Sequence, residues 1–247
     1  MPERKAAIVT GAASGIGRAV AARQVQDGMD VLAVDLHPDP DAPGVLHEAG
    51  LSQPESNAAV VADALERFGR LDVVVPCAGI QHVAPVEDFP TERWDTIIAL
   101  LLNSTFLLAK HAWPSLRESG AGRFIVIASV HGLVASPYKA AYVAAKHGVL
   151  GLVKTLALEG AEHGIAATAV CPGYVRTPLV ERQIADQATA HGMAEEDVLE
   201  QVILAPHAVK ELIEPSEVAE VVSFLAGTAG RSFTGVPVTM DLGWTAR

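Results

Sequence analysis

The chain has 247 residues, of which 50% are hydrophobic and 19% are charged. This length and apolar content predict one globular domain over residues 1–247 and exclude an intrinsically disordered chain, which would lack the side chains needed for a core. The formal net charge of −11 argues against nucleic acid and anionic membranes as partners, because both attract basic proteins.

Short apolar runs along the chain predict the strands of the fold. They lack the polar alternation of half-exposed strands and are typical of strands buried on both faces of a parallel sheet. In chain order they are Ala6–Thr10, Val31–Asp35, Leu71–Val75, Phe124–Ser129, Ala167–Cys171 and Val236–Asp241.

The start of the chain and its cysteines bear on its location. The chain enters the first predicted strand within five residues of Met1, which leaves no room for a signal peptide, and no apolar run approaches transmembrane length. Cys77 and Cys171 each end an apolar run, and a chain of this size needs no disulfide framework. We therefore expect a soluble protein in the cytoplasm.

Longer helical segments alternate with the predicted strands. They are Gly15–Asp27, Ser56–Phe68, Thr91–Glu118, Ala141–His163 and Pro215–Ala226. This alternation predicts an α/β fold, a single doubly wound Rossmann-type parallel sheet with helices on both faces.

Two segments interrupt the alternation. Leu36 to Ala49 contains Pro38, Pro40 and Pro43 and is too short for the usual crossover helix, so we expect a loop there. The polar segment Thr177–Glu214 is longer than a connection requires. Its pattern is helical at 178–189 and 195–209, which predicts a helical substrate lid over about 178–214.

A glycine-rich turn follows the first predicted strand. Thr10 to Gly17 has three glycines, which permit a tight turn and point helix N-terminal amides at a pyrophosphate. The turn would contribute Gly11, Ala13, Ser14, Gly15, Ile16 and Gly17 to a cofactor site. Alone such a turn is also compatible with a structural role, but its place between a strand and a helix favours a dinucleotide.

Asp35 ends the second predicted strand. An acidic residue there accepts hydrogen bonds from the adenosine ribose and repels a 2′-phosphate, so NAD is favoured over NADP. In isolation, an aspartate at a strand end is equally typical of a turn. The glycine turn beside it favours the cofactor interpretation.

Tyr142 and Lys146 lie four residues apart on a predicted helix, so they share a face. Ser129 ends the preceding strand. A neighbouring ammonium and an oxidised nicotinamide both favour the phenolate, which could then take a proton from an alcohol near neutral pH. Such a pair alone is common on helices and has no catalytic meaning by itself.

Together these motifs resemble the short-chain dehydrogenase/reductase family from end to end. They comprise Thr10–Gly17, Cys77-Ala78-Gly79, Ser129 thirteen residues before Tyr142, and Pro172-Gly173. The resemblance implies that Ser129 binds the substrate oxygen, Tyr142 is the acid/base, and Lys146 holds the nicotinamide ribose and lowers the tyrosine pKa. Further cofactor contacts are implied for Tyr142, Lys146, Ala78, Gly79, Pro172, Gly173, Val175 and Thr177.

Three potential donors flank these elements: Gln81, His131 and Lys139. Each is unremarkable as a loop residue, but together they suit a small carboxylate substrate. The stretches around them resemble the bacterial D-3-hydroxybutyrate dehydrogenases of that family. This closer resemblance implies that Gln81, His131, Lys139 and Gln183 hold the substrate carboxylate and that Trp244 packs on its methyl end.

The chain departs from the family pattern in several places. Pro76-Cys77 replaces an asparagine pair, and Gly50 lies near the place of an aspartate that contacts adenine. Leu101 aligns with a catalytic asparagine that supports a water relay ending at Lys146. Asn103 is two residues further on, a rotation of about 200° on an α-helix, so it could replace that asparagine only in a kinked or shifted helix.

The preferred hypothesis is an NAD-dependent enzyme that interconverts (R)-3-hydroxybutyrate and acetoacetate. Two alternatives remain: a family member for another hydroxy acid, a polyol or a 3-oxoacyl substrate, and an NAD-binding protein impaired in catalysis. We expect no bound metal, since the nine histidines form no His-Glu-x-x-His motif. The family resemblance implies a homotetramer built through the long helices.

Overall fold

The computed structural model describes residues 4–246. Its strands form one parallel sheet in the order β3-β2-β1-β4-β5-β6-β7. Their bounds are β1 Ala6–Thr10, β2 Asp30–Asp35, β3 Val45–Glu48, β4 Val73–Val75, β5 Arg123–Ile127, β6 Ala166–Pro172 and β7 Pro237–Met240. The order reverses between β1 and β4, and dinucleotides bind at such a switch point in open α/β sheets.

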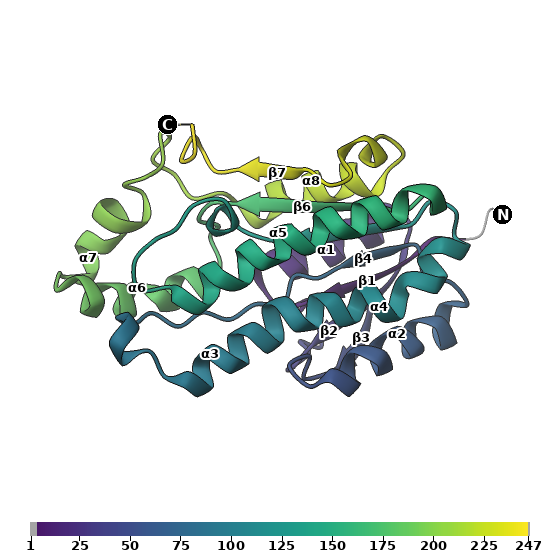
Figure 1. The fold of residues 1–247 in the computed structure, drawn as a ribbon, viewed down its shortest axis with the longest axis horizontal. Coiled ribbons are helices and arrows are strands. Elements are labelled where there is room, and N and C mark those ends of the chain that lie inside the picture. Colours follow the sequence, from purple (N-terminus) through teal and green to yellow (C-terminus); the bar gives the residue numbers. More distant parts are fainter. Residues whose placement is uncertain (1–3, 247) are drawn as a thin grey trace.

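Helices cover both faces of this sheet. They are α1 Gly15–Gln26, α2 Pro54–Phe68, α3 Thr91–Ile98, α4 Ser104–Glu118, α5 Ala140–Gly160, α6 Pro178–His191, α7 Glu195–Val198 and α8 Pro215–Ala226. Helices α1 and α8 pack together on one face, whereas α2, α4 and α5 cover the other. Figure 1 shows α4 and α5 crossing in front of the strands. The predicted doubly wound α/β fold is confirmed.

Alternate residues of the central strands enter two separate cores. Ile8 of β1 points toward α2, α4 and α5, while its neighbours Ala7 and Val9 pack on the side of α1 and α8. All three are fully buried. Burial on both faces explains why the strands appear in the sequence as uninterrupted apolar runs.

The segment between β2 and α2 differs from the prediction. Leu36 to Ala49 is not wholly a loop, because Val45–Glu48 forms β3 and pairs in parallel with β2. As the edge strand it buries little of its surface, with Val45 and Leu46 exposed. The prolines exclude a helix, as predicted, but the four residues after Gly44 are free to extend along β2.

The long apolar helix predicted from Thr91 to Glu118 is divided by a π-helical turn at Ala99–Asn103. By length and composition this segment could cross a membrane, which corrects the expectation that no apolar run approaches that length. Its residues Leu108, Ala112 and Leu116 are fully buried in the core. A core helix passes the same test, so this single helix is weak evidence for a span.

The long segment after β6 is helical, as predicted. It forms α6, α7 and a π-helical turn at Leu199–Ile203, so its second helix ends earlier than the expected residue 209. Main-chain bonds tie its two ends together: Ile213 N donates to Tyr174 O (3.0 Å) and Arg176 N to Ile213 O (2.9 Å).

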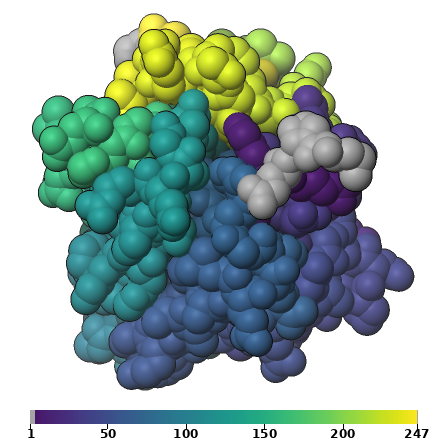
Figure 2. Space-filling model, turned by 90° about the vertical axis from the view of Figure 1, so that its right-hand side faces the viewer, coloured from purple at the N-terminus to yellow at the C-terminus, as the bar shows by residue number. Residues whose placement is uncertain are grey.

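This lid, residues 178–214, lies at one end of the molecule. Figure 1 shows α6 and α7 beyond the ends toward which the arrows of β6 and β7 point, opposite the N-terminus. Figure 2 shows the other end, where early, middle and late parts of the chain meet at the surface. The lid therefore covers the carboxyl ends of the strands, where the motif residues lie.

Candidate active site

The glycine turn between β1 and α1 is shaped for close approach. A Cβ on Gly11, at φ 68°, would lie 2.9 Å from Ala78 Cα, and one on Gly17 would lie 2.1 Å from the Gly11 carbonyl oxygen. Ser14, the N-cap of α1, is extended and makes no side-chain cap hydrogen bond. The first amides of α1 therefore remain available to an anion.

A cavity of about 520 Å³ opens at this turn. Its free helix amides, close backbone approach and Asp35 carboxylate fit a dinucleotide. Among the predicted cofactor residues, it is lined by Gly11, Ala13, Ser14, Gly15, Ile16, Gly17, Asp35, Ala78, Gly79 and Thr177. The other predicted cofactor residues, Tyr142, Lys146, Pro172, Gly173 and Val175, are not part of its lining.

Asp35 is held at the head of the turn. Its carboxylate accepts hydrogen bonds from Ala13 N (3.0 Å) and His37 N (3.2 Å). Arg18, whose guanidinium approaches the carbonyl of Ala13, pairs with Asp39 and donates to the carbonyl of Asp41 (3.1 Å). The carboxylate is thus fixed, and the cation beside the turn already has partners.

Several cavity residues lie outside the sequence prediction. The segment between β2 and α2 contributes Leu36, His37, Ala49, Leu51 and Ser52, and α6 contributes Arg182. Gly50, for which the resemblance already indicated a place near the adenine, also lines the cavity. A Cβ on Gly50 would meet Leu36 Cδ1 at 3.5 Å, an ordinary contact. The order of residues along an irregular segment does not show that the fold brings them to one cavity. Apart from Gly50, these lining residues could therefore be identified only from the fold.

The structure brings Ser129, Tyr142 and Lys146 together. Ser129 follows β5, and its hydroxyl lies close enough to that of Tyr142 to favour the phenolate. Lys146 Nζ lies 5.6 Å from the centre of the Tyr142 ring and donates to the carbonyl of Ile127 (2.7 Å). An alcohol oxygen placed beside Ser129 and Tyr142 would meet two hydroxyl groups able to exchange a proton with it.

Burial dominates the ionisation of these groups. It raises the pKa of Tyr142 to about 12, although the Ser129 hydroxyl acts in the opposite direction. Burial also lowers the pKa of Lys146 to about 8. In the protein alone the pKa of Tyr142 is therefore raised, because desolvation of the phenolate outweighs the effect of the Ser129 hydroxyl, and the lowering by Lys146 in the cofactor-bound site stays a prediction.

A second cluster joins three of the predicted carboxylate ligands. Lys139 is 2% exposed, and its Nζ donates to the Tyr174 hydroxyl (2.9 Å) and to Gln183 Oε1 (3.4 Å). His131 lies within electrostatic reach of Lys139, and burial lowers its pKa to about 3, so the ring is neutral. Trp244 stands edge-on to His131, with ring centres 5.3 Å apart.

Gln81 is the predicted ligand that the structure does not bring into this cluster. Its buried Oε1 has no hydrogen-bond partner, and within residues 4–246 it makes no recorded contact with Lys139. Lys139 itself pairs with no carboxylate in the described part of the chain. The site thus keeps a buried cation without a protein counter-charge.

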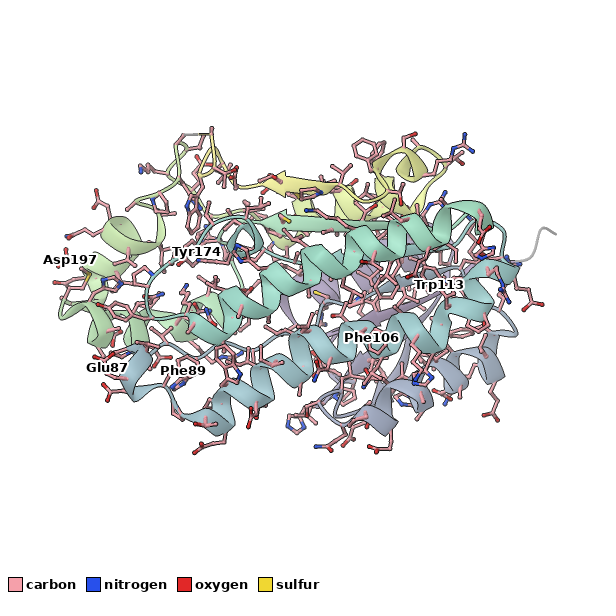
Figure 3. The ribbon with its side chains drawn as sticks, viewed as in Figure 1. Glu87, Phe89, Phe106, Trp113, Tyr174 and Asp197 are labelled. Carbon is pink, nitrogen blue, oxygen red and sulfur yellow. The ribbon has the colours of Figure 1, made fainter. Side chains whose placement is uncertain are left out.

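Tyr174 is a site residue that sequence reasoning missed. It stacks on Trp244, with ring centres 5.6 Å apart and planes at 17°, and stands edge-on to His131. Figure 3 places it at the lid end of the molecule, inward of Asp197 on α7. The only sequence feature that could have indicated a role for Tyr174 is its place directly after Pro172-Gly173, in a region otherwise assigned to the cofactor.

The place behind Tyr142 is apolar. Leu101 is 2% exposed and packs with Ile97, Ala141 and Ala145, and its carbonyl accepts the Thr105 hydroxyl (2.7 Å). The π-helical turn changes the register here, yet Asn103 remains exposed. Asn103 therefore does not replace the polar side chain expected at Leu101.

Hydrogen bonds to one side-chain hydroxyl and one carbonyl join the central strands near Pro76-Cys77. The Thr10 hydroxyl accepts from Cys77 N (2.9 Å) and Ala78 N (3.0 Å), and the Pro76 carbonyl accepts from Ile127 N (2.9 Å). Burial raises the pKa of the Cys77 thiol to about 12 and that of Cys171 to about 11. Both thiols are therefore protonated at neutral pH and poor nucleophiles.

Known proteins resemble the chain in both sequence and fold. The family described as short chain dehydrogenase matches residues 5–188. D-beta-hydroxybutyrate dehydrogenase from Rhizobium meliloti is 44% identical over 98% of this chain and 99% of its own, and the protein of that name from Cupriavidus necator is 39% identical over 98% of each chain.

A solved structure agrees with this assignment. Ligand-free aldohexose dehydrogenase from Thermoplasma acidophilum aligns with a TM-score of 0.91 and 31% identity, covering 99% of this chain and 95% of that one. The family match and the full-length relatives confirm the resemblance found in the sequence motifs. The chain therefore belongs to the short-chain dehydrogenase family and is a dehydrogenase of that family.

Proposed function

We propose that this protein is an NAD-dependent dehydrogenase that interconverts (R)-3-hydroxybutyrate and acetoacetate by hydride transfer. The observation that carries the proposal is the buried Lys139 ammonium, which has no carboxylate partner in the described residues. An unpaired buried cation is costly, so a site that keeps one suits an anionic substrate. The relatives from R. meliloti and C. necator bear the name of this activity.

In the proposed reaction, Tyr142 takes the proton of the substrate alcohol during oxidation and returns it during reduction. A bound oxidised cofactor would accept the hydride and add positive charge near the phenol, which opposes the effect of burial on its pKa. The Ser129 hydroxyl holds the reacting oxygen. Lys146 would bind the nicotinamide ribose, and its lowered pKa lets it exchange a proton near neutral pH.

The second cluster would bind both ends of the substrate. The carboxylate would accept hydrogen bonds from Lys139 and Gln183, with Gln81 approaching from the loop after β4. Neutral His131 would donate from Nε2 in exchange for its bond with the Ser136 hydroxyl (2.9 Å). The methyl group would pack on Trp244. In the structure the side-chain amide of Gln81 leaves its buried oxygen without a partner. Rotation of this amide would present its NH₂ group to the carboxylate instead.

The proposed cofactor is NAD rather than NADP. The fixed Asp35 carboxylate lies where a 2′-phosphate would approach, and Arg18 is already paired with Asp39. Pro172, Gly173, Val175 and Thr177 would hold the nicotinamide amide. These assignments extend the family membership to particular residues of this chain.

We also propose a cytoplasmic homotetramer. Phe106 on α4 and Leu158 on α5 are 48% and 81% exposed, respectively, so the two long helices offer apolar side chains to partner subunits. The free thiols Cys77 and Cys171 suit a reducing compartment.

A substrate panel with NAD and NADP in parallel tests the function. NADH should form with (R)-3-hydroxybutyrate, and Tyr142→Phe should reduce kcat by roughly 10²- to 10⁴-fold. Lys139→Ala should raise KM for the acid and leave a neutral secondary alcohol unchanged. Wild-type turnover with Tyr142→Phe would overturn the mechanism, and calorimetric NAD binding without turnover on any alcohol would indicate an impaired enzyme.

A further inference from the structure

Tyr174 occupies the contact between the buried cation and the lid. Its side chain is 7% exposed, and its hydroxyl accepts a hydrogen bond from Lys139 Nζ at 2.9 Å. The ammonium also lies 4.9 Å from the centre of the Tyr174 ring. Tyr174 is thus the side chain nearest to Lys139 for which the sequence predicted no role in substrate binding.

The hydrogen of the Tyr174 hydroxyl has no acceptor within residues 4–246. A phenol can donate one hydrogen bond and accept others, whereas an ammonium only donates. The contact with Lys139 therefore uses a lone pair of the tyrosine oxygen. Burial raises the pKa of this phenol, so its proton stays in place and is available to a ligand.

We propose that Tyr174 is a further substrate-binding residue, whose hydroxyl donates a hydrogen bond to the substrate carboxylate while it accepts one from Lys139. The inference rests on the proposed function, because it requires an acid as substrate. The phenol and the ammonium then form a pair of adjacent donors on one anion.

The ring of Tyr174 is held in place on two sides. It stacks on Trp244 and stands edge-on to His131, with ring centres 6.4 Å apart in the latter pair. Such packing fixes the hydroxyl before the substrate arrives, so little ordering is required on binding. The groups around Lys139 are a neutral imidazole, a protonated phenol and an amide, so the site has one net positive charge to match one carboxylate.

Tyr174→Phe provides the sharpest test, because it keeps the ring and removes the hydroxyl. We expect KM for (R)-3-hydroxybutyrate to rise roughly tenfold, as for loss of a hydrogen bond to a charged group, with kcat changed much less. A neutral alcohol such as 2-butanol should be turned over as by the wild type. Tyr138→Phe is the matched control, because the Tyr138 hydroxyl makes no hydrogen bond within residues 4–246. This variant should leave KM unchanged.

A second comparison separates direct binding from an effect through Lys139. In a Lys139→Met background, Tyr174→Phe should still raise KM for the acid several-fold, because the hydroxyl contacts the carboxylate itself. No further increase there would show that Tyr174 acts only by holding Lys139 and would overturn the inference. The double variant removes the ammonium together with its hydroxyl partner, so neither is left unpaired. The comparison therefore remains informative if Tyr174→Phe alone fails to fold.

The two proposals can fail separately. If the wild type turns over no hydroxy acid, the proposed function fails, and the inference fails with it. If the wild type oxidises (R)-3-hydroxybutyrate but Tyr174→Phe keeps the wild-type KM, only the role of Tyr174 is lost.

Discussion

Leu101 places an apolar side chain beside the acid/base of the proposed reaction. It packs with Ala141, Ala145 and the ring of Tyr142, and its carbonyl is already bonded to Thr105. Where related enzymes are expected to support a water relay toward Lys146, this position offers no polar side chain. Release of the proton from Lys146 should therefore be slower than in an enzyme with an asparagine there.

Leu101→Asn should restore a polar group and raise kcat a few-fold, with a smaller solvent isotope effect. The same change should lower the free energy of unfolding by about 2–4 kcal/mol, because a buried leucine is replaced by an amide without assured partners. Rates in H₂O and D₂O and thermal melting measure both effects. Leu101→Ala is the control for lost packing, and equal kcat changes in the two variants would contradict the relay argument.

At the scale of residues, the sequence predicts what local spacing determines. Tyr142 and Lys146 share a helix face, and Ser129 ends a neighbouring strand, so chain positions suffice to bring them together. The contact of Tyr174 with Lys139 joins segments 35 residues apart, so no local pattern contains it. The raised pKa of Tyr142 likewise depends on desolvation of its phenol by surrounding elements, a property of the whole fold.

At the scale of elements, the segment between β2 and α2 forms one wall of the cavity, where the proposed cofactor would place its adenosine. Leu36, Ala49, Gly50 and Leu51 line it, and these residues offer no charged side chain to an adenine. The resemblance predicts an aspartate near Gly50. These residues should therefore contribute little to the affinity for the cofactor.

Gly50→Asp should tighten NAD binding by roughly 3- to 10-fold, the gain expected of one added hydrogen bond. The site can accept a side chain, because an added Cβ would approach only Leu36 Cδ1, at 3.5 Å. Titration calorimetry with NAD gives the dissociation constant directly. Gly50→Ala should show no such gain, and an equal gain in both variants would point to loop rigidity instead of an adenine contact.

Helix α6 connects the lid with the cofactor cavity through Arg182. This arginine lines the cavity together with Gly15 and Ile16 and makes no ion pair in the described structure. Because the N-terminus of α1 lies on the same cavity, a bound pyrophosphate would place negative charge within reach of Arg182. Cofactor binding should therefore favour the closed position of the lid.

Arg182→Gln should weaken NADH binding several-fold at low ionic strength, and the difference should shrink as salt is added, because exposed charges are screened. Fluorescence titration of NADH at several salt concentrations measures this. Lys154→Gln removes an exposed cation from α5, outside the cavity, and controls for net charge. A salt-independent loss would indicate a packing effect of the side chain.

The elements themselves were predictable to different degrees. Strands such as β1 and β6 are buried on both faces, so their apolar runs are unmistakable. β3 is an exposed edge strand with no apolar pattern, and its pairing with β2 arises only in the folded sheet. The π-helical turn at Ala99–Asn103 was not predicted either, because it is a single turn within an otherwise continuous helical pattern.

At the scale of the whole molecule, the net charge of −11 coexists with two buried lysines in the site. Salt screens the distant acidic surface beyond about 8 Å, so a local positive pocket can still attract a carboxylate. Composition predicted the acidic surface but not the pocket. The expectation that residues 1–247 form a single domain stays a prediction.

The buried lysines make stability depend on pH. Burial lowers the pKa of Lys139 and Lys146 from 10.5 to about 8, so between these values the unfolded chain binds more protons than the folded one. The free energy of unfolding should therefore rise with pH above about 8, by at most about 1.4 kcal/mol per pH unit for each lysine. The buried thiols act in the opposite direction, increasingly so from about pH 8 upward, because their folded pKa values are raised from 9.0 and the unfolded chain loses these protons first.

Lys139→Met should remove one lysine's share of this pH dependence. Urea denaturation from about pH 8 to about pH 9 should then show a slope less than half that of the wild type, because Lys146 alone remains to be deprotonated on folding while the thiols of the unfolded chain begin to ionise. Lys154→Met, which replaces an exposed lysine of α5, should keep the wild-type slope. An unchanged slope in Lys139→Met would mean that Lys139 is hydrated in solution, and the unpaired buried cation that supports an acid as substrate would be lost with it.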